Sequence, residues 1–201
     1  MDLLLIRHAH DDRVGPHARR LSALGRAQCA ALAKSLIGSR ADELWTSPRS
    51  RAVETAREIS RTLRLPLRTD PRSEEIRTAR PEDPDVLPPR ERVGVTLADG
   101  TEDWNAFLDR VSAFVSERCL GSHDDRTVVL VTHSGVFDAV HEVLTGSGRR
   151  VELEIAHTGI TTWRHRPGSP AGTWLLRRHN DVAHLAREGL LTDGDYVERR
   201  P

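Results

Sequence analysis

The sequence predicts an α/β fold, a three-layer sandwich in which helices flank a mainly parallel central sheet. Two observations support this prediction. Short, uninterrupted apolar runs at residues 2–6 and 127–133 are typical of strands that are covered on both faces. Other segments repeat apolar residues at spacings of three and four, which predicts helices between and after these strands. Folds of this kind bind ligands at the carboxyl ends of their strands.

The first predicted helix covers residues 22–38, with Ser22 as its N-cap and Gly38 as its stop. One face of this helix is expected to hold its larger apolar side chains: Leu24, Cys29, Leu32, Leu36 and Ile37. Residues 41–47 then predict a brief strand that ends in a turn.

A second helix is predicted to begin at Pro48, with Ser47 as its cap. Later helices are expected at residues 101–120 and 135–146, and later strands around residues 158–166 and 172–180. Residues 71–101 interrupt this order, because they are dense in proline and charge and have no sustained period. We therefore expect one domain over residues 1–201, with an irregular insertion or lid at about 71–101 and a loose tail after Leu185.

Composition points away from several classes of partner. Charged residues make up 30% of the chain but the formal net charge is +0, so we expect no nucleic-acid partner and no membrane partner. No apolar run approaches the ~18 residues of a membrane helix, and the N-terminus lacks the features of a secretory leader. We expect a cytoplasmic protein in which Cys29 and Cys119 are buried free thiols. The oligomeric state is left open.

Two of the predicted strands end in histidine, at His8 and His133. Neighbouring parallel strands would bring both imidazoles to one edge of the sheet. Arg7 stands beside His8, and Arg51 lies one turn into the helix that follows residues 46–48. The helix after His133 offers backbone N–H groups near Ser134. Together these groups predict a site for a dianion, most simply a phosphoryl group.

Such a site needs an acid that protonates the departing alcohol. A carboxylic acid whose pKa is raised by partial burial and by the negative charge of the phosphate would serve. Glu74 and Glu75 are available where the irregular segment begins, and the residues by themselves do not choose between them.

The chain resembles a known family through an ordered set of motifs: LIRHAH, LSALGRAQ, TSPRSRAVETA, DPRSEEI, GTEDWNAFLDRV, VVLVTHSG and HNDVAHL. The resemblance is to the phosphoglycerate mutase-like branch of the histidine phosphatase superfamily, and it extends from Met1 to about Leu185. It implies a phosphoglycerate mutase-like fold and a phosphatase that needs neither metal nor cofactor.

The resemblance also assigns roles. It implies that His8 is the nucleophile and forms a phosphohistidine, that Glu75 is the acid, and that His133 takes part in catalysis. It implies that Arg7, Arg51 and His133 bind the phosphoryl oxygens, and the helix N-terminus adds Ser134 to the expected phosphate-binding residues.

The chain departs from the family pattern where the rest of the substrate should lie. Ala9 and His10 replace the usual glycine and polar residue, and we expect slight backbone strain at Ala9. Candidate substrate-binding residues around this position are His10, Asp11 and Arg77. With both acidic and basic groups there, we expect a small, polar phosphorylated metabolite as the substrate.

Three alternatives remain beside the phosphatase. Phosphotransfer of the phosphoglycerate mutase type uses the same chemistry, but the irregular segment is short for covering the site and excluding water. A binuclear metal hydrolase would use residues 8–12 as a His-x-His-x-Asp ligand set. A regulatory module would bind phosphate without turnover.

Overall fold

A computed structural model of the chain describes residues 1–14, 18–77, 102–120, 125–148, 151–166 and 173–192. The strands are β1 (Asp2–Arg7), β2 (Asp11–Val14), β3 (Ala18–Leu21), β4 (Glu43–Thr46), β5 (Leu67–Thr69), β6 (Thr127–Thr132), β7 (Ile160–Arg166) and β8 (Thr173–Asp181). The helices are α1 (Ala23–Ser35), α2 (Ser50–Leu63), α3 (Trp104–Val115), α4 (Ser134–Thr145) and α5 (Ala183–Glu188). A 3₁₀ turn, η1, spans Pro71–Ser73, and a π-helical turn, η3, extends α3 over Ser116–Leu120.

The central sheet has six strands in the order β5-β4-β6-β1-β7-β8. The pairs from β5 to β1 are parallel, and β7 and β8 join by antiparallel pairing. The predicted α/β class with a mainly parallel sheet is therefore confirmed. In the pairing of β1 with β6, Arg7 lies opposite Thr132, so these two strands end side by side.

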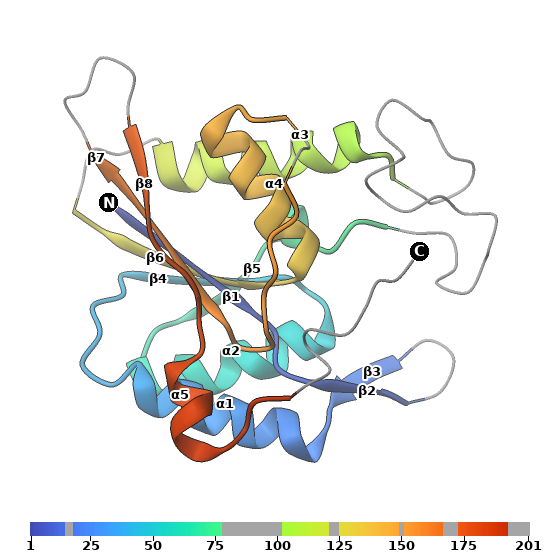
Figure 1. Ribbon diagram of the computed structural model, residues 1–201, viewed down its shortest axis with the longest axis vertical. Helices are drawn as coiled ribbons and strands as arrows, with labels where there is room; N and C mark the ends of the chain where they lie inside the picture. The colour runs from blue at the N-terminus through green and yellow to red at the C-terminus, as the bar shows by residue number, and fades with distance from the viewer. Residues whose placement is uncertain (15–17, 78–101, 121–124, 149–150, 167–172, 193–201) are drawn as a thin grey trace.

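Helices cover both faces of this sheet, with α3 and α4 on one side and α1, α2 and α5 on the other (Figure 1). The central strand β6 is buried along its whole length. Its successive side chains point to opposite faces of the sheet, and helices cover both faces. Val128 and Leu130 join the core beneath α3 and α4. Val129 and Val131 join the second core, beneath α1 and α2. An uninterrupted apolar strand is thus explained by burial on two sides.

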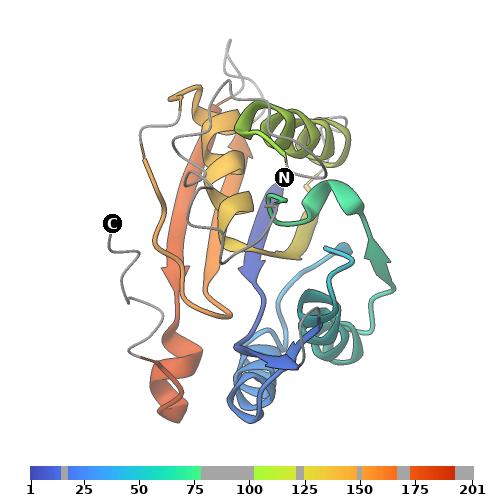
Figure 2. The same ribbon diagram turned by 90° about the vertical axis from the view of Figure 1, so that its right-hand side faces the viewer.

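The sequence did not predict the β2–β3 hairpin or the short edge strand β5. The hairpin follows β1 and lies against α1 and α2 (Figure 2). Its residues are mostly polar and do not alternate with apolar ones, so the usual periodic signal of a strand is missing there.

One local prediction about the first helix was wrong. Ile37 is 69% exposed, because α1 ends at Ser35 and the chain has left the helix before Ile37. Ser22 does cap α1, since its side chain accepts a hydrogen bond from the Gly25 backbone N–H. In the described part of the chain after Leu185, α5 continues to Glu188, and Gln28 donates a hydrogen bond to the Leu190 carbonyl.

The start of α2 also differs from the prediction. The helix begins at Ser50 with Arg49 as the N-cap residue, two residues later than expected. Ser47 accepts a hydrogen bond from the Arg49 N–H, but its hydroxyl also contacts His133. Ser47, which was predicted as a helix cap, is therefore part of the site described below.

Cys29 and Cys119 are both free and buried, as predicted. Burial in apolar surroundings raises the pKa of each thiol to about 12, so both remain protonated at neutral pH. No helix in the described part of the chain combines the length and apolar character that crossing a membrane requires.

Candidate active site

The parallel pairing of β1 and β6 brings two histidines together where the strands end. His8 follows β1 and His133 follows β6, and the centroids of their rings are 5.1 Å apart. The His8 N–H continues the sheet ladder by donating to the Thr132 carbonyl at 2.8 Å. Both imidazoles are buried. The expectation that the two rings share one edge of the sheet is met.

Arg51, in the first turn of α2, bridges the two rings. Its Nε donates to His8 Nε2 at 3.0 Å, and its Nη2 donates to His133 Nδ1 at 3.1 Å. Thr55, one turn further along α2, donates to the Arg51 carbonyl and accepts from the Ala9 N–H. The helix is thus tied to the chain that follows β1, and the guanidinium is held at both imidazoles.

These contacts determine where each neutral ring has its proton. His8 Nδ1 lies 2.9 Å from the Ala9 carbonyl, which can only accept, so Nδ1 donates and the lone pair is on Nε2. For His133 the order is reversed, because Nδ1 accepts from Arg51 and Nε2 donates to Ser47 Oγ at 2.8 Å. Sequence reasoning missed Ser47 as a partner of His133, because its place before a helix suggested a cap.

Both histidines are neutral at pH 7. Burial lowers the pKa of His8 well below its usual range, and the positive charge of Arg51 adds to the effect. Burial and Arg51 lower the pKa of His133 in the same way. A neutral His8 has an unprotonated Nε2 and is able to act as a nucleophile.

This burial predicts a pH-dependent stability. Because the folded-state pKa values of His8 and His133 lie below the unfolded value of about 6.5, the unfolded chain binds more protons as the pH falls. The free energy of unfolding should therefore decrease below about pH 6.5, by up to about 1.4 kcal/mol per pH unit for each histidine. His184, whose pKa burial also lowers, adds to the slope.

Urea denaturation at a series of pH values between about 7.5 and 5 measures this slope. A His133→Asn variant should show a shallower slope over the same window, because one of the buried imidazoles is gone. An unfolding free energy that is constant over this range in the native sequence would contradict the assignment of neutral, buried imidazoles.

Glu75 lies at the N-terminus of α4. Its Oε2 accepts from the Gly135 N–H at 3.2 Å and lies 3.4 Å from Ser134 Oγ. A Cβ at Gly135 would overlap Glu75 Oε1, so the close approach of the carboxyl depends on this glycine. Glu74 points elsewhere and pairs with Arg49 at 3.1 Å. Of the two candidate acids, Glu75 is the one that reaches the helix after His133.

Arg7 and Ser134 were both predicted to bind phosphate. The Arg7 side chain lies at the end of β1 and donates to the Ile155 carbonyl. Ser134 Oγ is the hydroxyl that faces Glu75. Both residues are thus at the same edge of the sheet as His8.

The three candidate substrate-binding residues occupy different places. His10 is held by Ser22 Oγ at 2.8 Å through its ring and by Gln28 through its N–H. The Asp11 side chain is only 5% exposed and lies 3.9 Å from His8 Nδ1. Arg77 is exposed, and the structure brings its backbone to Glu102.

Ala9 does not show the expected strain. It is absent from the described residues with positive φ, and its methyl group packs with Leu21 and Cys29 in a small apolar cluster. Ala9 is therefore accommodated by packing rather than by unusual dihedral angles.

His157 is a neighbour of the site that sequence reasoning missed. Its ring centroid lies 5.4 Å from that of His8 and 5.3 Å from that of His10. It belongs to a turn in which Thr158 has a positive φ of 58° and its hydroxyl contacts His184 Nε2. No motif or period in the sequence marked this turn, because its position depends on β7 pairing with β1.

Among the described residues, the cluster that could hold a metal ion differs from the His-x-His-x-Asp set of the prediction. Possible ligand atoms of His8, Asp11 and His157 lie within 4.8 Å of one another. A cation that bound His8 would have to displace one contact of its ring, either that of Nδ1 with the Ala9 carbonyl or that of Nε2 with Arg51.

Comparisons with known proteins agree with this geometry. The profile of the histidine phosphatase superfamily (branch 1) matches residues 3–181. Among solved structures, a mycobacterial glucosyl-3-phosphoglycerate phosphatase with inorganic phosphate is 24% identical with a TM-score of 0.74, over 91% of this chain and 98% of that one. Bacillus stearothermophilus YhfR is 20% identical with a TM-score of 0.75, over 92% and 98%.

Entamoeba histolytica phosphoserine phosphatase in complex with 3-phosphoglyceric acid is 19% identical with a TM-score of 0.73, over 92% of this chain and 98% of that one. A search of curated proteins found no match. At these identities the solved structures show the fold.

An α/β fold with two buried imidazoles and a bridging arginine at the strand ends is an arrangement that can stabilise a bound anion. The chain belongs to the histidine phosphatase superfamily, branch 1, because the family profile covers nearly all of it. It is a phosphatase of the histidine phosphatase type.

Proposed function

We propose that this protein is a metal-independent phosphomonoesterase that acts through a phosphohistidine at His8. The observation that supports this most directly is the neutral, buried His8 ring, whose Nε2 lone pair faces the Arg51 guanidinium. Arg51 Nε donates to this lone pair in the structure, so the attack requires Arg51 to exchange that hydrogen bond for one to a phosphoryl oxygen, where its positive charge is stabilising.

In the first step His8 Nε2 attacks phosphorus, the N–P bond forms, and the P–O bond to the alcohol breaks. Glu75, protonated at that moment, gives its proton to the leaving oxygen. In the second step water attacks phosphorus and Glu75 takes a proton from it. The N–P bond breaks, and inorganic phosphate and neutral His8 are released.

Arg7 and Arg51 are assigned to the phosphoryl oxygens as fixed cations. His133 needs a proton before it can join them, because its Nδ1 accepts from Arg51 and its Nε2 donates to Ser47. The negative charge of a bound phosphate favours that proton, so His133 would become a donor when substrate binds.

The substrate is proposed to be a small, polar phosphorylated metabolite. Polar groups lie next to His8 on the side of His10, Asp11 and His157, and they would contact the part of the substrate beyond the phosphate. The proteins of similar fold include phosphatases of glucosyl-3-phosphoglycerate and phosphoserine, which are substrates of this class.

The test is a screen of phosphomonoesters with the purified protein in excess chelator, with released phosphate as the readout. Hydrolysis of small polar phosphates is expected to continue in the chelator. Loss of activity in chelator would indicate a metal hydrolase, and transfer of phosphate between substrates without release would indicate a mutase. Phosphate binding with no turnover on any substrate, including nitrophenyl phosphate, would indicate a regulatory module.

A further inference from the structure

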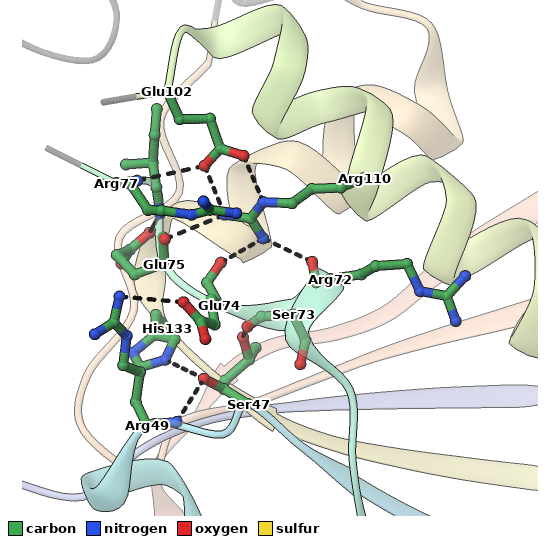
Figure 3. Close-up of polar contacts among 12 residues, drawn as sticks. Ser47, Arg49, Arg72, Ser73, Glu74, Glu75, Arg77, Glu102, Arg110 and His133 are labelled. Atoms are coloured by element: carbon green, nitrogen blue, oxygen red, sulfur yellow. Dashed lines mark hydrogen bonds and ion pairs between the residues drawn. The ribbon is translucent and has the colours of Figure 1, made fainter. Parts of the chain in front are cut away.

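The segment that contains Glu75 is held mainly by two residues distant in the sequence, Arg110 and Glu102, and belongs to no sheet or helix. Residues 74–77 have no regular secondary structure, and their carbonyl groups need donors because buried backbone groups are nearly always paired. Arg110 of α3 supplies these donors. Its Nη1 donates to the carbonyls of Arg72 at 2.7 Å and Glu74 at 2.8 Å, and its Nη2 donates to that of Glu75 at 3.1 Å (Figure 3).

The guanidinium of Arg110 is itself fixed by Glu102. Nε donates to Glu102 Oε1 at 2.6 Å and Nη2 to Oε2 at 2.8 Å, a two-point ion pair. Both side chains are largely buried, with 13% and 9% exposed, so the pair is shielded from water. The guanidinium also lies 4.7 Å from the centroid of the Phe107 ring.

Glu102 holds the far end of the same segment. Its N–H donates to the Arg77 carbonyl at 2.9 Å, and its Oε2 accepts from the Arg77 N–H at 3.4 Å. Arg110 and Glu102 therefore contact the backbone on both sides of Glu75. The carboxyl of Glu75 is held separately, by Gly135 of α4.

We propose that Arg110, oriented by Glu102, is a positioning residue that sets where Glu75 presents its carboxyl. This inference rests on the proposed function, in which Glu75 is the proton donor. The planar guanidinium of Arg110 has five N–H donors and contacts three carbonyls and a carboxylate at once. The ammonium group of a lysine cannot make all of these contacts. A displacement of the segment would move the carboxyl away from the leaving oxygen and leave His8 and Arg51 in place.

The test compares Arg110→Lys with the native protein on an alkyl phosphate and on nitrophenyl phosphate. Lysine keeps the positive charge that acts on His133. A change in activity therefore reports the loss of the guanidinium hydrogen bonds rather than the loss of the charge. We expect kcat/KM on the alkyl phosphate, which reports only the step in which Glu75 protonates the leaving oxygen, to fall by up to about 10²-fold, because small misplacements of a catalytic group are costly. On nitrophenyl phosphate, which needs little protonation, kcat/KM should change little, and inorganic phosphate should bind with unchanged Kd.

A matched control is Arg126→Lys. Arg126 also joins a glutamate, Glu43, to a backbone carbonyl, that of Arg118, but it precedes β6 at the opposite end from His133. The Arg126→Lys variant should be less stable in urea denaturation. Any change in its activity should be the same for both leaving groups. Glu102→Gln, which removes the charge that orients Arg110, provides a second variant with the expected pattern of Arg110→Lys.

The double variant of Glu75→Gln and Arg110→Lys separates positioning from a general structural role. On the alkyl phosphate it should be no worse than Glu75→Gln alone, because the carboxyl that Arg110 positions is already gone. Additive losses, or equal losses on both substrates, would overturn the inference. If the loss of activity in Glu75→Gln depends on the leaving group and the loss in Arg110→Lys does not, only the positioning role fails. If Glu75→Gln itself shows no such dependence, the proposed acid and this inference fail together.

Discussion

Turnover in a His8→Asn variant should fall by about 10⁴-fold or more, on good and poor leaving groups alike. Asparagine places an amide near the former ring, but it has no lone pair on nitrogen able to form a bond to phosphorus. The loss should appear in kcat, because Arg7, Arg51 and His133 still surround the phosphate. Released phosphate under saturating substrate measures it.

A rapid quench with labelled substrate at neutral to alkaline pH tests the intermediate directly. Label should be recovered on His8 in the native protein and be absent from His8→Asn. A matched control is His165→Asn, since His165 lies in β7 beside Trp174, away from the strand ends that bear the site. A trapped phosphoserine, or undiminished turnover in His8→Asn, would contradict the mechanism.

The second large effect is expected from Glu75→Gln. Glutamine keeps the size of the side chain and an oxygen able to accept from Gly135, but it has no proton to give. The value of kcat/KM, which excludes the later attack of water, should fall by roughly 10²–10⁴-fold for an alkyl phosphate and much less for nitrophenyl phosphate. Steady-state kinetics on the two substrates measures the difference.

Glu74→Gln is the matched control, because it changes the adjacent carboxylate, which pairs with Arg49. It should have little effect on either substrate, and the reverse result would make Glu74 the acid. Gly135→Ala is an independent variant that displaces the Glu75 carboxyl by overlap with its new methyl group. It should selectively slow hydrolysis of the alkyl phosphate. The stability of α4 should not fall, since alanine is a better helix former than glycine by roughly 1 kcal/mol.

Much of the site was predictable because its main residues end strongly apolar strands. The runs that precede His8 and His133 are buried on both faces, and such strands occupy the middle of a parallel sheet, where their ends meet. Arg51 was predictable from its place one turn into a helix. These inferences needed only local pattern and the general geometry of parallel sheets.

The residues by themselves left the choice between Glu74 and Glu75 open, and only the resemblance to the family favoured Glu75. Both lie in an irregular segment, whose conformation depends on contacts with Arg110, 36 residues from Glu74, and Gly135, 60 residues from Glu75. Ser47 was expected to cap a helix because its sequence position fits a cap, yet it contacts His133 from 86 residues away.

The sequence by itself therefore determined the α/β class, the two strand-end histidines and the family, since hydrophobic period and ordered motifs are local properties of the chain. Only the tertiary structure decided which carboxylate reaches α4, that His157 stands beside His8, and that Arg110 holds the acid segment. The physical reason is that segments without a period take their conformation from side chains that reach them across the fold. Those partners are distant in the sequence and are brought close only when the sheet and its two helical layers have formed.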